Sequence, residues 1–299
     1  MPESSEAEVP AAETPMRAPW VRLLRPRQWV KNGFVFAPLV FTGLYHQEPS
    51  LLRVAALFGL FCVASSAVYV FNDLFDLEDD RKHPEKRCRR PLAAGAISPT
   101  AAWVLLACLE AITAGAAVLL GRVGLVLAAY QALNVLYTVR LKDVPIVDLF
   151  CIAAGFVLRV YAGAVILDVP LSPWMLNTTL CLALYLVATK RLQEKKAHED
   201  SARPVLKQYS QSLLEYFAFL SAVGALLFYG IFALTVRKEL ALSIPLVLFG
   251  FFRYRYIVDC LDGGESPTDA LWQDFPLALT VLAWVGVCFY AMRMEGLGS

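Results

Sequence analysis

The chain has 299 residues, of which 58% are hydrophobic and 18% are charged, and its mean hydropathy is +0.54. A soluble protein of this length carries roughly a quarter charged residues, so the composition excludes an ordinary soluble domain and indicates a membrane protein. The formal net charge is +1, and the seven cysteines form neither a CxxC pair nor a Cys/His spacing, which argues against a disulfide framework and a zinc site.

The first 19 residues differ in composition from the rest of the chain. They are rich in Pro, Ala, Ser and Glu, and such a stretch cannot bury enough apolar surface to become ordered. They also lack the basic start and the apolar run of a signal peptide. We therefore predict a disordered cytoplasmic tail over 1–19, followed by a single membrane domain over 20–299.

Nine apolar stretches follow, each near the length of about 20 residues that a helix needs to cross the hydrocarbon core of a bilayer. Short connections follow the first, third, fifth and seventh stretches, and long polar connections follow the second, sixth and eighth. The sequence thus predicts an all-α, polytopic membrane protein. Its nine expected spans are 28–46, 51–75, 98–119, 121–139, 145–167, 171–192, 211–236, 242–259 and 275–294.

The basic residues predict the orientation, because Lys and Arg are enriched in the cytoplasmic connections of membrane proteins. With the N-terminus inside, 21 of the 27 Lys and Arg residues fall on the cytoplasmic side, while 5 fall outside and Arg159 lies within the fifth span. We therefore expect a multi-pass protein of the cell membrane whose N-terminus, polar loops and active-site cavity face the cytoplasm.

The second span ends in the acidic stretch Asn72–Asp80, which reads NDLFDLEDD. At 100° per residue, the carboxylates of Asp73, Asp76 and Asp80 share one helix face, which Asn72 flanks. Hard oxygen ligands without His or Cys favour Mg²⁺, an ion that commonly bridges to substrate phosphates. The stretch predicts a Mg²⁺ site beside a phosphorylated ligand. The simpler alternative is that the acids only balance a basic loop.

Cations lie next to these acids and at the other cytoplasmic ends of the spans. The stretch from His83 to Pro91 contains four of them, and the fork of an arginine matches the geometry of phosphate. A plainer explanation exists for each, because basic residues flank spans for topology and lysines extend toward the interface. The other polar residues at these ends include Arg27, Gln28, Lys31, Asn32, Tyr137, Lys142, Lys190 and Arg191.

The fifth span contains two charged residues, Asp148 and Arg159, which lie eleven positions apart and within about 20° on one helix face. A buried arginine in a membrane costs about 2.5–3.5 kcal/mol or more, so Arg159 must be paired or solvated. Glu110 lies at a similar depth in the third span. Two explanations stay open: Arg159 pairs with Glu110, or it binds a ligand.

The acidic motif at the end of the second of nine spans resembles the NDxxDxxxD motif of the UbiA intramembrane prenyltransferase superfamily. Further short motifs follow the same order as in one branch, the decaprenyl-phosphate phosphoribosyltransferases, and the resemblance covers nearly the whole chain from residue 22. These motifs are RPRQWVKN at 25–32, HPEKR and RPLAAG within 83–95, YTVRLK at 137–142, LRVYAG at 158–163, TKRLQE at 189–194 and the Arg-Tyr pair at 253–254.

The resemblance implies a nine-helix UbiA-like bundle that transfers 5-phosphoribose from phosphoribosyl pyrophosphate (PRPP) to a polyprenyl phosphate such as decaprenyl phosphate. Pyrophosphate is released, Mg²⁺ is the cofactor, and the product is a precursor of cell-wall arabinan. The expected partners are PRPP, the lipid phosphate and the bilayer, with no nucleic acid, and a homo-oligomer stays open.

The same resemblance assigns roles to residues of this chain. The implied metal ligands are Asn72, Asp73, Asp76 and Asp80. The implied catalytic residues are Asp73, Asp76, Lys86, Tyr137 and Lys142. The implied substrate-binding residues are Arg27, Gln28, Lys31, Asn32, Asn72, Arg87, Arg90, Lys190 and Arg191, and Arg159 joins them if the second of its two explanations holds. The stretch HPEKRCRRP is one residue longer than the family's HPxKRxRP, so Arg89 and Arg90 compete for the position before the proline.

Two other functions compete with this one. A prenyltransferase that moves a polyprenyl group from its diphosphate to an aromatic acceptor typically carries a second acidic motif after the sixth span. Here residues 190–200 begin with Lys190 and Arg191 and contain no DxxxD, which favours an anion bound directly, such as a prenyl monophosphate. A transporter or lipid-binding protein is disfavoured because no pair of spans reads as inverted repeats with broken helices.

Overall fold

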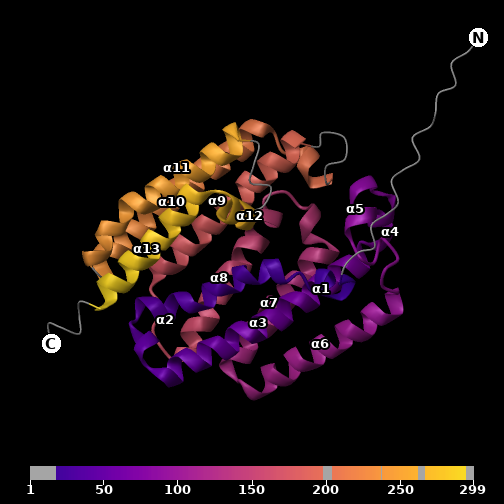
Figure 1. Ribbon diagram of the computed structural model, residues 1–299, viewed down its shortest axis with the longest axis horizontal. Helices are drawn as coiled ribbons and strands as arrows, with labels where there is room; N and C mark the ends of the chain where they lie inside the picture. The colour runs from indigo at the N-terminus through magenta and orange to yellow at the C-terminus, as the bar shows by residue number, and fades with distance from the viewer. Residues whose placement is uncertain (1–17, 198–203, 237, 262–266, 294–299) are drawn as a thin grey trace, which may run out of the picture.

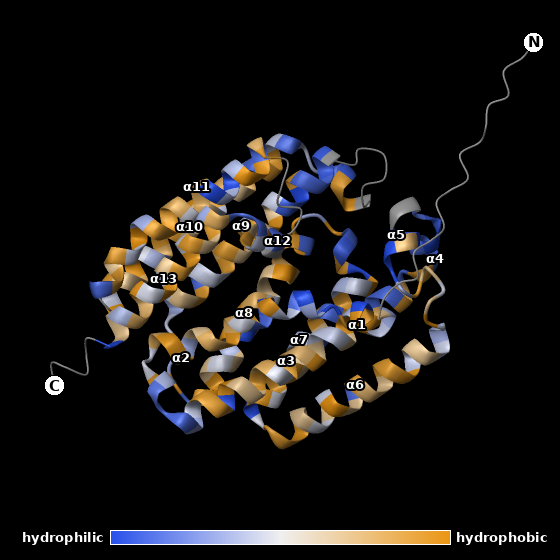
Figure 2. Cartoon of the chain, in the orientation of Figure 1, coloured by the Kyte–Doolittle hydropathy of each residue, from blue (hydrophilic) through white to orange (hydrophobic). Residues whose placement is uncertain are grey.

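Long apolar helices dominate the computed structural model, which describes residues 18–197, 204–236, 238–261 and 267–293 (Figure 1). Residues 1–17 of the predicted tail lie outside this part of the chain. By length and composition, seven described helical segments are able to cross a membrane: α3 (Glu48–Phe75), α6 (Pro99–Leu119), α7 (Arg122–Val139), α8 (Val147–Leu167), α10 (Gln211–Val236), Lys238–Cys260, which joins η5 (Lys238–Ser243) to α11 (Ile244–Cys260), and α13 (Phe275–Arg293). The prediction of an all-α polytopic membrane protein is confirmed, and Figure 2 shows these helices largely covered by apolar residues.

The first predicted span, 28–46, is not one helix. It is divided into the 3₁₀ helix η1 (Pro26–Phe36), the short helix α2 (Ala37–Phe41) and the 3₁₀ turn η2 (Leu44–His46). Pro38 lacks the amide hydrogen that a continuous helix needs at that position. Gly43, at φ +71°, adopts the left-handed conformation that ends α2.

The sixth predicted span corresponds to α9 (Pro173–Ala197), which is long enough to cross a bilayer. It does not reach the hydropathy of the seven segments above, because polar residues such as Asn177, Thr179 and Thr189 interrupt its apolar sequence. It packs along α10 on one side and α8 on the other. The count of nine spans therefore stays a prediction, with seven of them supported by the described helices.

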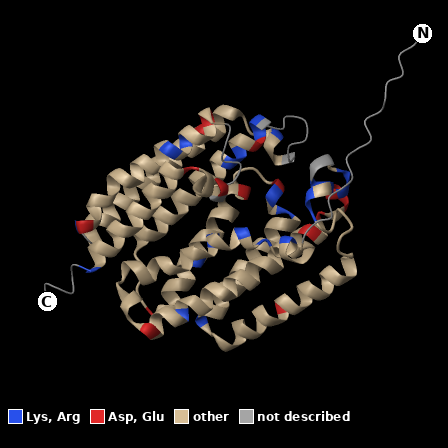
Figure 3. Ribbon diagram, viewed as in Figure 1, with Lys and Arg blue, Asp and Glu red and all other residues tan. Residues whose placement is uncertain are grey.

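One end of the bundle carries most of the polar connections, and we call it the polar end. Figure 3 shows charged residues concentrated there and sparse along the middle of the helices. The helix α1 (Pro19–Leu24) packs on α3 near this end. The short elements that make up the polar end are α4 (Leu77–Lys82), α5 (Pro84–Arg89), η3 (Leu141–Asp143), η4 (Pro204–Gln208) and α12 (Pro267–Gln273).

A close backbone contact holds η1 against α8. A Cβ atom added at Gly163 would lie 2.1 Å from the carbonyl oxygen of Val35 and 3.2 Å from Cδ of Pro38. Only a residue without a side chain fits there, so Gly163 allows η1 to lie directly on α8. This contact sets the position of Lys31 and Asn32, which η1 carries.

We predict that Gly163→Ala destabilises the protein by about 1–3 kcal/mol, because the added methyl group pushes the backbone of η1 away from α8. The measurement is the thermal unfolding midpoint in detergent micelles. The matched control is Gly59→Ala in α3, where an added Cβ meets no atom within 4 Å. That variant should keep or raise the midpoint, since alanine favours a helix by about 1 kcal/mol over glycine. Equal midpoints for the two variants would contradict the close contact.

Candidate functional site

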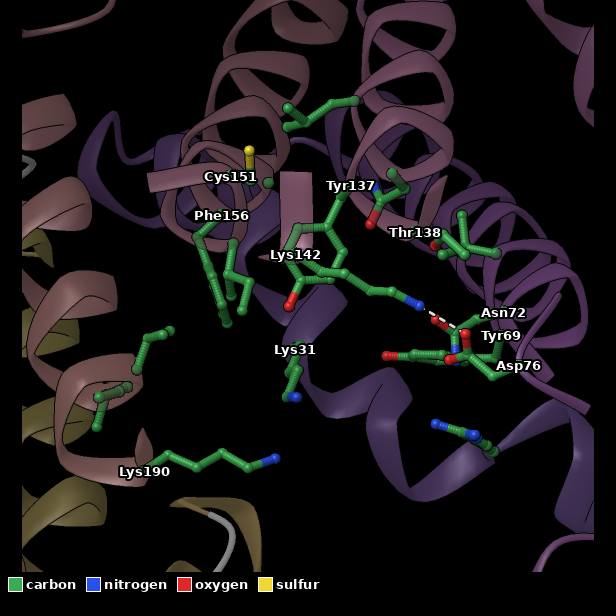
Figure 4. Close-up of a pocket in the computed structure, with 18 of the residues that line it drawn as sticks. Lys31, Tyr69, Asn72, Asp76, Tyr137, Thr138, Lys142, Cys151, Phe156 and Lys190 are labelled. Carbon is green, nitrogen blue, oxygen red and sulfur yellow. Dashed lines mark hydrogen bonds and ion pairs between the residues drawn. The ribbon is translucent and has the colours of Figure 1, made fainter. Parts of the chain in front are cut away.

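A cavity of about 780 Å³ lies at the polar end and brings together side chains from η1, α3, α4, α7, α8, α9 and the connections between them (Figure 4). Its lining contains most of the residues that the sequence singled out. These are Lys31, Asn72, Asp76, Asp80, Lys86, Arg90, Tyr137, Lys142, Arg159, Lys190 and Arg191.

The acidic stretch bends where α3 gives way to α4. Helical hydrogen bonding nevertheless continues across the junction, because the Asp76 amide donates to the Asn72 carbonyl and the Asp80 amide donates to the Asp76 carbonyl, both at 2.9 Å. The shared helical phase that the sequence predicted is therefore retained. Asn72, Asp76 and Asp80 line the cavity, whereas Asp73 is only 2% exposed and lies behind the lining.

Each carboxylate of the predicted metal set is paired with a cation. Lys142 Nζ lies 2.5 Å from Asp76 Oδ1, the contact drawn as a dashed line in Figure 4. Arg90 donates to Asp73 Oδ1 at 3.1 Å and also to Asp80. The acids that were expected to face a metal ion thus face protein cations in this structure, and Arg90 bridges two of them.

The environment of Asp80 shows what these pairs do. Burial raises the pKa of its carboxyl group, and the positive charges of Arg90 and of Lys86, whose Nζ lies 3.9 Å away, oppose that rise. The two arginines before the proline differ in where they lie. Arg90 lines the cavity and binds the acids, whereas Arg89 is exposed.

Arg25 and Tyr69 also line the cavity, and the sequence did not assign either of them a role. Arg25 forms an ion pair with Asp73, and its guanidinium lies over the Tyr69 ring, 5.0 Å from the centroid. Its backbone is left-handed (φ 52°, ψ 55°), which is uncommon for a residue with a side chain and especially before a proline. The place of Arg25 at the start of the RPRQWVKN motif was a sequence signal that could have identified it as a site residue. Tyr69 lies in an apolar stretch, and nothing in the sequence around it indicated a site residue.

Arg159 lines the cavity but is only 6% exposed, and all of its hydrogen-bond partners are neutral. Its guanidinium donates to Asn32 Oδ1 at 2.8 Å, to the Gly155 carbonyl at 2.7 Å and to the Tyr130 hydroxyl at 2.8 Å. It also lies 4.7 Å from the centroid of the Tyr130 ring and 5.5 Å from that of Phe156, distances typical of cation–π contacts.

The suggested pair between Glu110 and Arg159 is wrong. Glu110 instead accepts hydrogen bonds from the side-chain amide of Gln131 at 3.1 and 3.3 Å. The two charged residues lie on helices of similar depth, but they use different partners. Of the two explanations left open by the sequence, the structure therefore removes the one that neutralised Arg159 within the protein.

Arg191 was expected to bind substrate, yet its guanidinium is largely occupied by the protein. It lies 3.2 Å from Asp148 Oδ2 and 2.7 Å from Glu194 Oε2, and it donates to the Tyr137 hydroxyl at 3.1 Å. Asp148 also accepts a hydrogen bond from the Tyr209 hydroxyl at 2.7 Å. Arg191 thereby positions Tyr137 at the cavity and ties α9 to the beginning of α8.

Four predicted substrate-binding residues do not line the cavity. Arg27 and Arg87 are exposed, and Gln28 is half-buried outside it. Asn32 is fully buried, where it donates to Ser65 Oγ at 3.1 Å and accepts from Arg159. In this structure Asn32 acts on the site through the orientation of Arg159.

The buried pair of Asp148 and Arg191 generates a stability prediction. Asp148 is 0% exposed, so Asp148→Asn should destabilise the protein by up to about 3–5 kcal/mol, the cost of breaking a buried ion pair. The matched control is Asp168→Asn, since Asp168 pairs with Arg122 at 3.1 Å but both side chains are about four-fifths exposed. That control should cost about 0–1 kcal/mol. Thermal unfolding in detergent compares them, and equal losses would argue against a structural role for Asp148.

The acidic side of the cavity fits Mg²⁺ in the kind of atoms it offers, because Asn72, Asp76 and Asp80 supply amide and carboxylate oxygens. Within the described ranges, no group of three or more His, Cys, Asp or Glu side chains is placed so that it could hold a metal ion. Arg90 and Lys142 instead occupy the carboxylates. At this site a metal ion would compete with Arg90 and Lys142 for the carboxylate oxygens.

Comparison with known proteins relates this site to one family. The model of the UbiA prenyltransferase family matches residues 34–273. The chain is 35% identical over 277 residues to the decaprenyl-phosphate phosphoribosyltransferase of Mycobacterium tuberculosis, covering 89% of this chain and 91% of that protein. It is 32% identical to the enzyme of the same name from Mycolicibacterium smegmatis, covering 89% and 90% of the two chains.

Solved structures share the fold at lower sequence identity. A UbiA homologue from Archaeoglobus fulgidus, bound to DMAPP and Mg²⁺, superposes with a TM-score of 0.68 at 20% identity, covering 92% of this chain and 99% of that chain. A digeranylgeranylglyceryl phosphate synthase superposes with a TM-score of 0.64 at 15% identity, covering 92% and 97%. The resemblance inferred from the motifs is confirmed: the chain belongs to the UbiA prenyltransferase family, and it is a multi-pass membrane transferase.

Proposed function

We propose that the protein transfers 5-phosphoribose from PRPP to a polyprenyl phosphate of the decaprenyl type and releases pyrophosphate. The observation that carries this proposal is the charge of the cavity. Among the described residues that line it, eight are Lys or Arg and four are Asp. Such an excess of cations suits two phosphorylated substrates, whereas a prenyl diphosphate with an aromatic acceptor brings fewer phosphate charges. Relatives that are 31–35% identical over 89% of the chain are named for this reaction.

The acidic side of the cavity is the proposed site of the pyrophosphate group. Mg²⁺ bound by Asn72, Asp76 and Asp80 would neutralise the charge that builds up on the leaving pyrophosphate. Asp73, the fourth predicted ligand, stays a prediction, and in this structure it holds Arg25 and Arg90. When the donor binds, Arg90 and Lys142 are free to turn from the carboxylates to phosphate oxygens, because charge-assisted bonds of similar strength replace the ones they leave.

The reaction then needs little proton transfer. The bond between C1 of the ribose and the pyrophosphate oxygen breaks, and its electron pair leaves with pyrophosphate. An oxygen of the lipid phosphate attacks C1 from the opposite face, which forms the new C–O bond and inverts the anomeric centre. That oxygen is already anionic at neutral pH, so no strong base is required. This agrees with a chain that has only three histidines.

We also propose that the polar end faces the cytoplasm and that residues 20–299 form one catalytic domain in the cell membrane. The support is the distribution of charge, with 21 of the 27 Lys and Arg residues expected on that side. A polyprenyl phosphate held by the bilayer reaches the cavity laterally, while a soluble charged donor enters from water. The membrane then keeps the lipid close to the site, which lowers the entropic cost of the encounter.

The direct test combines purified protein, Mg²⁺, radiolabelled PRPP and a polyprenyl monophosphate. We expect lipid-soluble label only when all three additions are present. Asp76→Asn should lower product formation by more than about 100-fold, because it removes charge beside the leaving group. The matched control is Lys207→Met, since Lys207 is exposed in η4 and is not part of the cavity lining. It should keep nearly full activity.

Other outcomes of that assay would reject the proposal. If the wild-type protein made no product from PRPP but transferred a prenyl group from its diphosphate to an aromatic acid, the alternative function would hold instead. If Asp76→Asn remained fully active while folded, as judged by its unfolding midpoint, the acidic side would not bind the leaving group.

The two neighbouring arginines give a second, sharper comparison. Arg90 bridges Asp73 and Asp80 at the cavity, whereas Arg89 is exposed. We expect Arg90→Met to lower kcat/KM for PRPP by about 10- to 100-fold, the effect of losing one or two hydrogen bonds to a charged group. Arg89→Met should change it by less than about threefold. Equal losses of kcat/KM in the two variants would show that contact with Asp73 and Asp80 does not determine which arginine binds PRPP.

A further inference from the structure

Lys31 differs from the other cations at the cavity. Its side chain lines the cavity from η1, and it has no hydrogen bond or ion pair with any residue that the structure describes. The other lining cations, Arg159 apart, each lie within 4 Å of a carboxylate oxygen. They are Arg25, Lys86, Arg90, Lys142, Lys190 and Arg191.

Arg159 is the second cation at the cavity without an acidic partner in the described part of the chain. Three of its N–H groups donate to the neutral oxygens of Asn32, Gly155 and Tyr130. A guanidinium has five N–H donors, so two remain for a ligand. Its positive charge is buried, and hydrogen bonds to neutral oxygens orient it without neutralising it.

These two cations lie close together. Lys31 is near enough to Arg159, Lys190 and Arg25 for their charges to repel it, and Asp269 of α12 is an opposing charge. Arg159 also donates to Asn32, the residue that follows Lys31 in η1. In Figure 4 the side chains of Lys31 and Lys190 point into the open space on the side away from Asp76. Like charges gathered in a half-buried cavity are stabilised when an anion lies between them.

We propose that Lys31 and Arg159 form a second anion site, distinct from the acidic side, that binds the phosphate monoester of the lipid acceptor. This assignment rests on the proposed function, because it divides the two phosphorylated substrates between the two sides of one cavity. The donor's pyrophosphate takes the side of Asp76 and Asp80. The acceptor's phosphate takes the side of Lys31 and Arg159, the two lining cations that have no acidic partner in an ion pair among the described residues.

The surroundings favour a lipid over the 5-phosphate of a sugar. Arg159 follows Val147, the first residue of α8, by 12 positions, so it lies about 18 Å along the helix from the polar end. An apolar groove between α7, α8 and α9 shares Leu133 with the cavity and includes Leu158, the residue directly before Arg159. The groove adjoins the cavity at Leu133, so we place the hydrocarbon chain of a lipid bound at Arg159 along this groove.

The test measures binding of farnesyl monophosphate to the full-length protein in detergent, with EDTA present and without PRPP, by isothermal titration calorimetry. Binding of farnesol, which lacks the phosphate, measures how much the hydrocarbon chain of the ligand contributes to the affinity. We expect the wild-type protein to bind the monophosphate without a metal ion. Lys31→Met should weaken binding by at least about 10-fold, the loss of one charged contact. The matched control Lys207→Met should bind like the wild type, and Asp76→Asn, which leaves Lys142 without this carboxylate, should not weaken binding.

Lys31→Met is the decisive variant because Lys31 has no hydrogen bond or ion pair with a described residue, whereas Arg159 is tied into the bundle by three hydrogen bonds. Unchanged binding by Lys31→Met overturns the proposal. So does binding that requires Mg²⁺ and is lost in Asp76→Asn, or a Lys31-dependent site that prefers ribose 5-phosphate. A protein that binds farnesyl monophosphate through Lys31 but fails to use PRPP would reject the proposed function and leave this site intact.

Discussion

Every charge buried in this bundle needs a partner, and the partners that α8 provides organise the rest of the structure. Asp148, in the first turn of α8, binds Arg191 from α9 and Tyr209 from the segment before α10. Arg159, eleven residues later on nearly the same face, binds Asn32 from η1 and Tyr130 from α7. Two buried charges on one helix thus connect four other segments, and each connection joins parts of the chain that are far apart in sequence.

The same face of α8 determines where η1 lies. Gly163 follows Arg159 by one helical turn, and its missing side chain allows the backbone of Val35 to approach α8 directly. A regular helix over 26–46 has its backbone shielded by side chains, so the division of this segment into short 3₁₀ and α pieces is what makes the contact available. The ammonium group of Lys31 reaches the cavity from a segment held in this way. The contact between Gly163 and the backbone of Val35 therefore helps to set where Lys31 places its positive charge in the cavity.

The sequence predicted the helices that local apolar composition determines. It missed the contacts between side chains that are far apart in the chain. The ends of α6, α7, α8 and α10 fall within two residues of the predicted spans, since apolar composition alone determines such helices. The acidic motif was also visible, because charge at the edge of a bilayer needs a reason, while the choice between Arg89 and Arg90 stayed open. Asp148 lies 43 residues from its partner Arg191, and Asn32 lies 127 residues from its partner Arg159, and neither separation leaves a periodic signal in the sequence.

Arg25 shows why the remaining part of the site was not accessible to pattern alone. Its place before Pro26 predicts an extended backbone, yet it adopts a left-handed conformation that turns the chain between α1 and η1. That turn aims its guanidinium at Asp73, so tertiary contacts override the local preference. Strain of this kind is maintained only where the surroundings compensate for it, and here the compensation is the partly buried ion pair between Arg25 and Asp73.

The balance of charge at the cavity finally constrains how a metal ion enters. The described lining has more cations than acids, and Asp76 and Asp80 are already paired with Lys142 and Arg90. A bare divalent cation would add to the positive excess and would have to displace Lys142 from Asp76 and Arg90 from Asp80, leaving Arg90 with Asp73 alone. A divalent ion that arrives on a diphosphate brings the anion with it. Arg90 and Lys142 then exchange one set of anionic oxygens for another, and the electrostatic cost of opening the acidic side largely disappears. The ion pairs seen here therefore fit the proposed function best if the metal ion enters together with a diphosphate rather than alone.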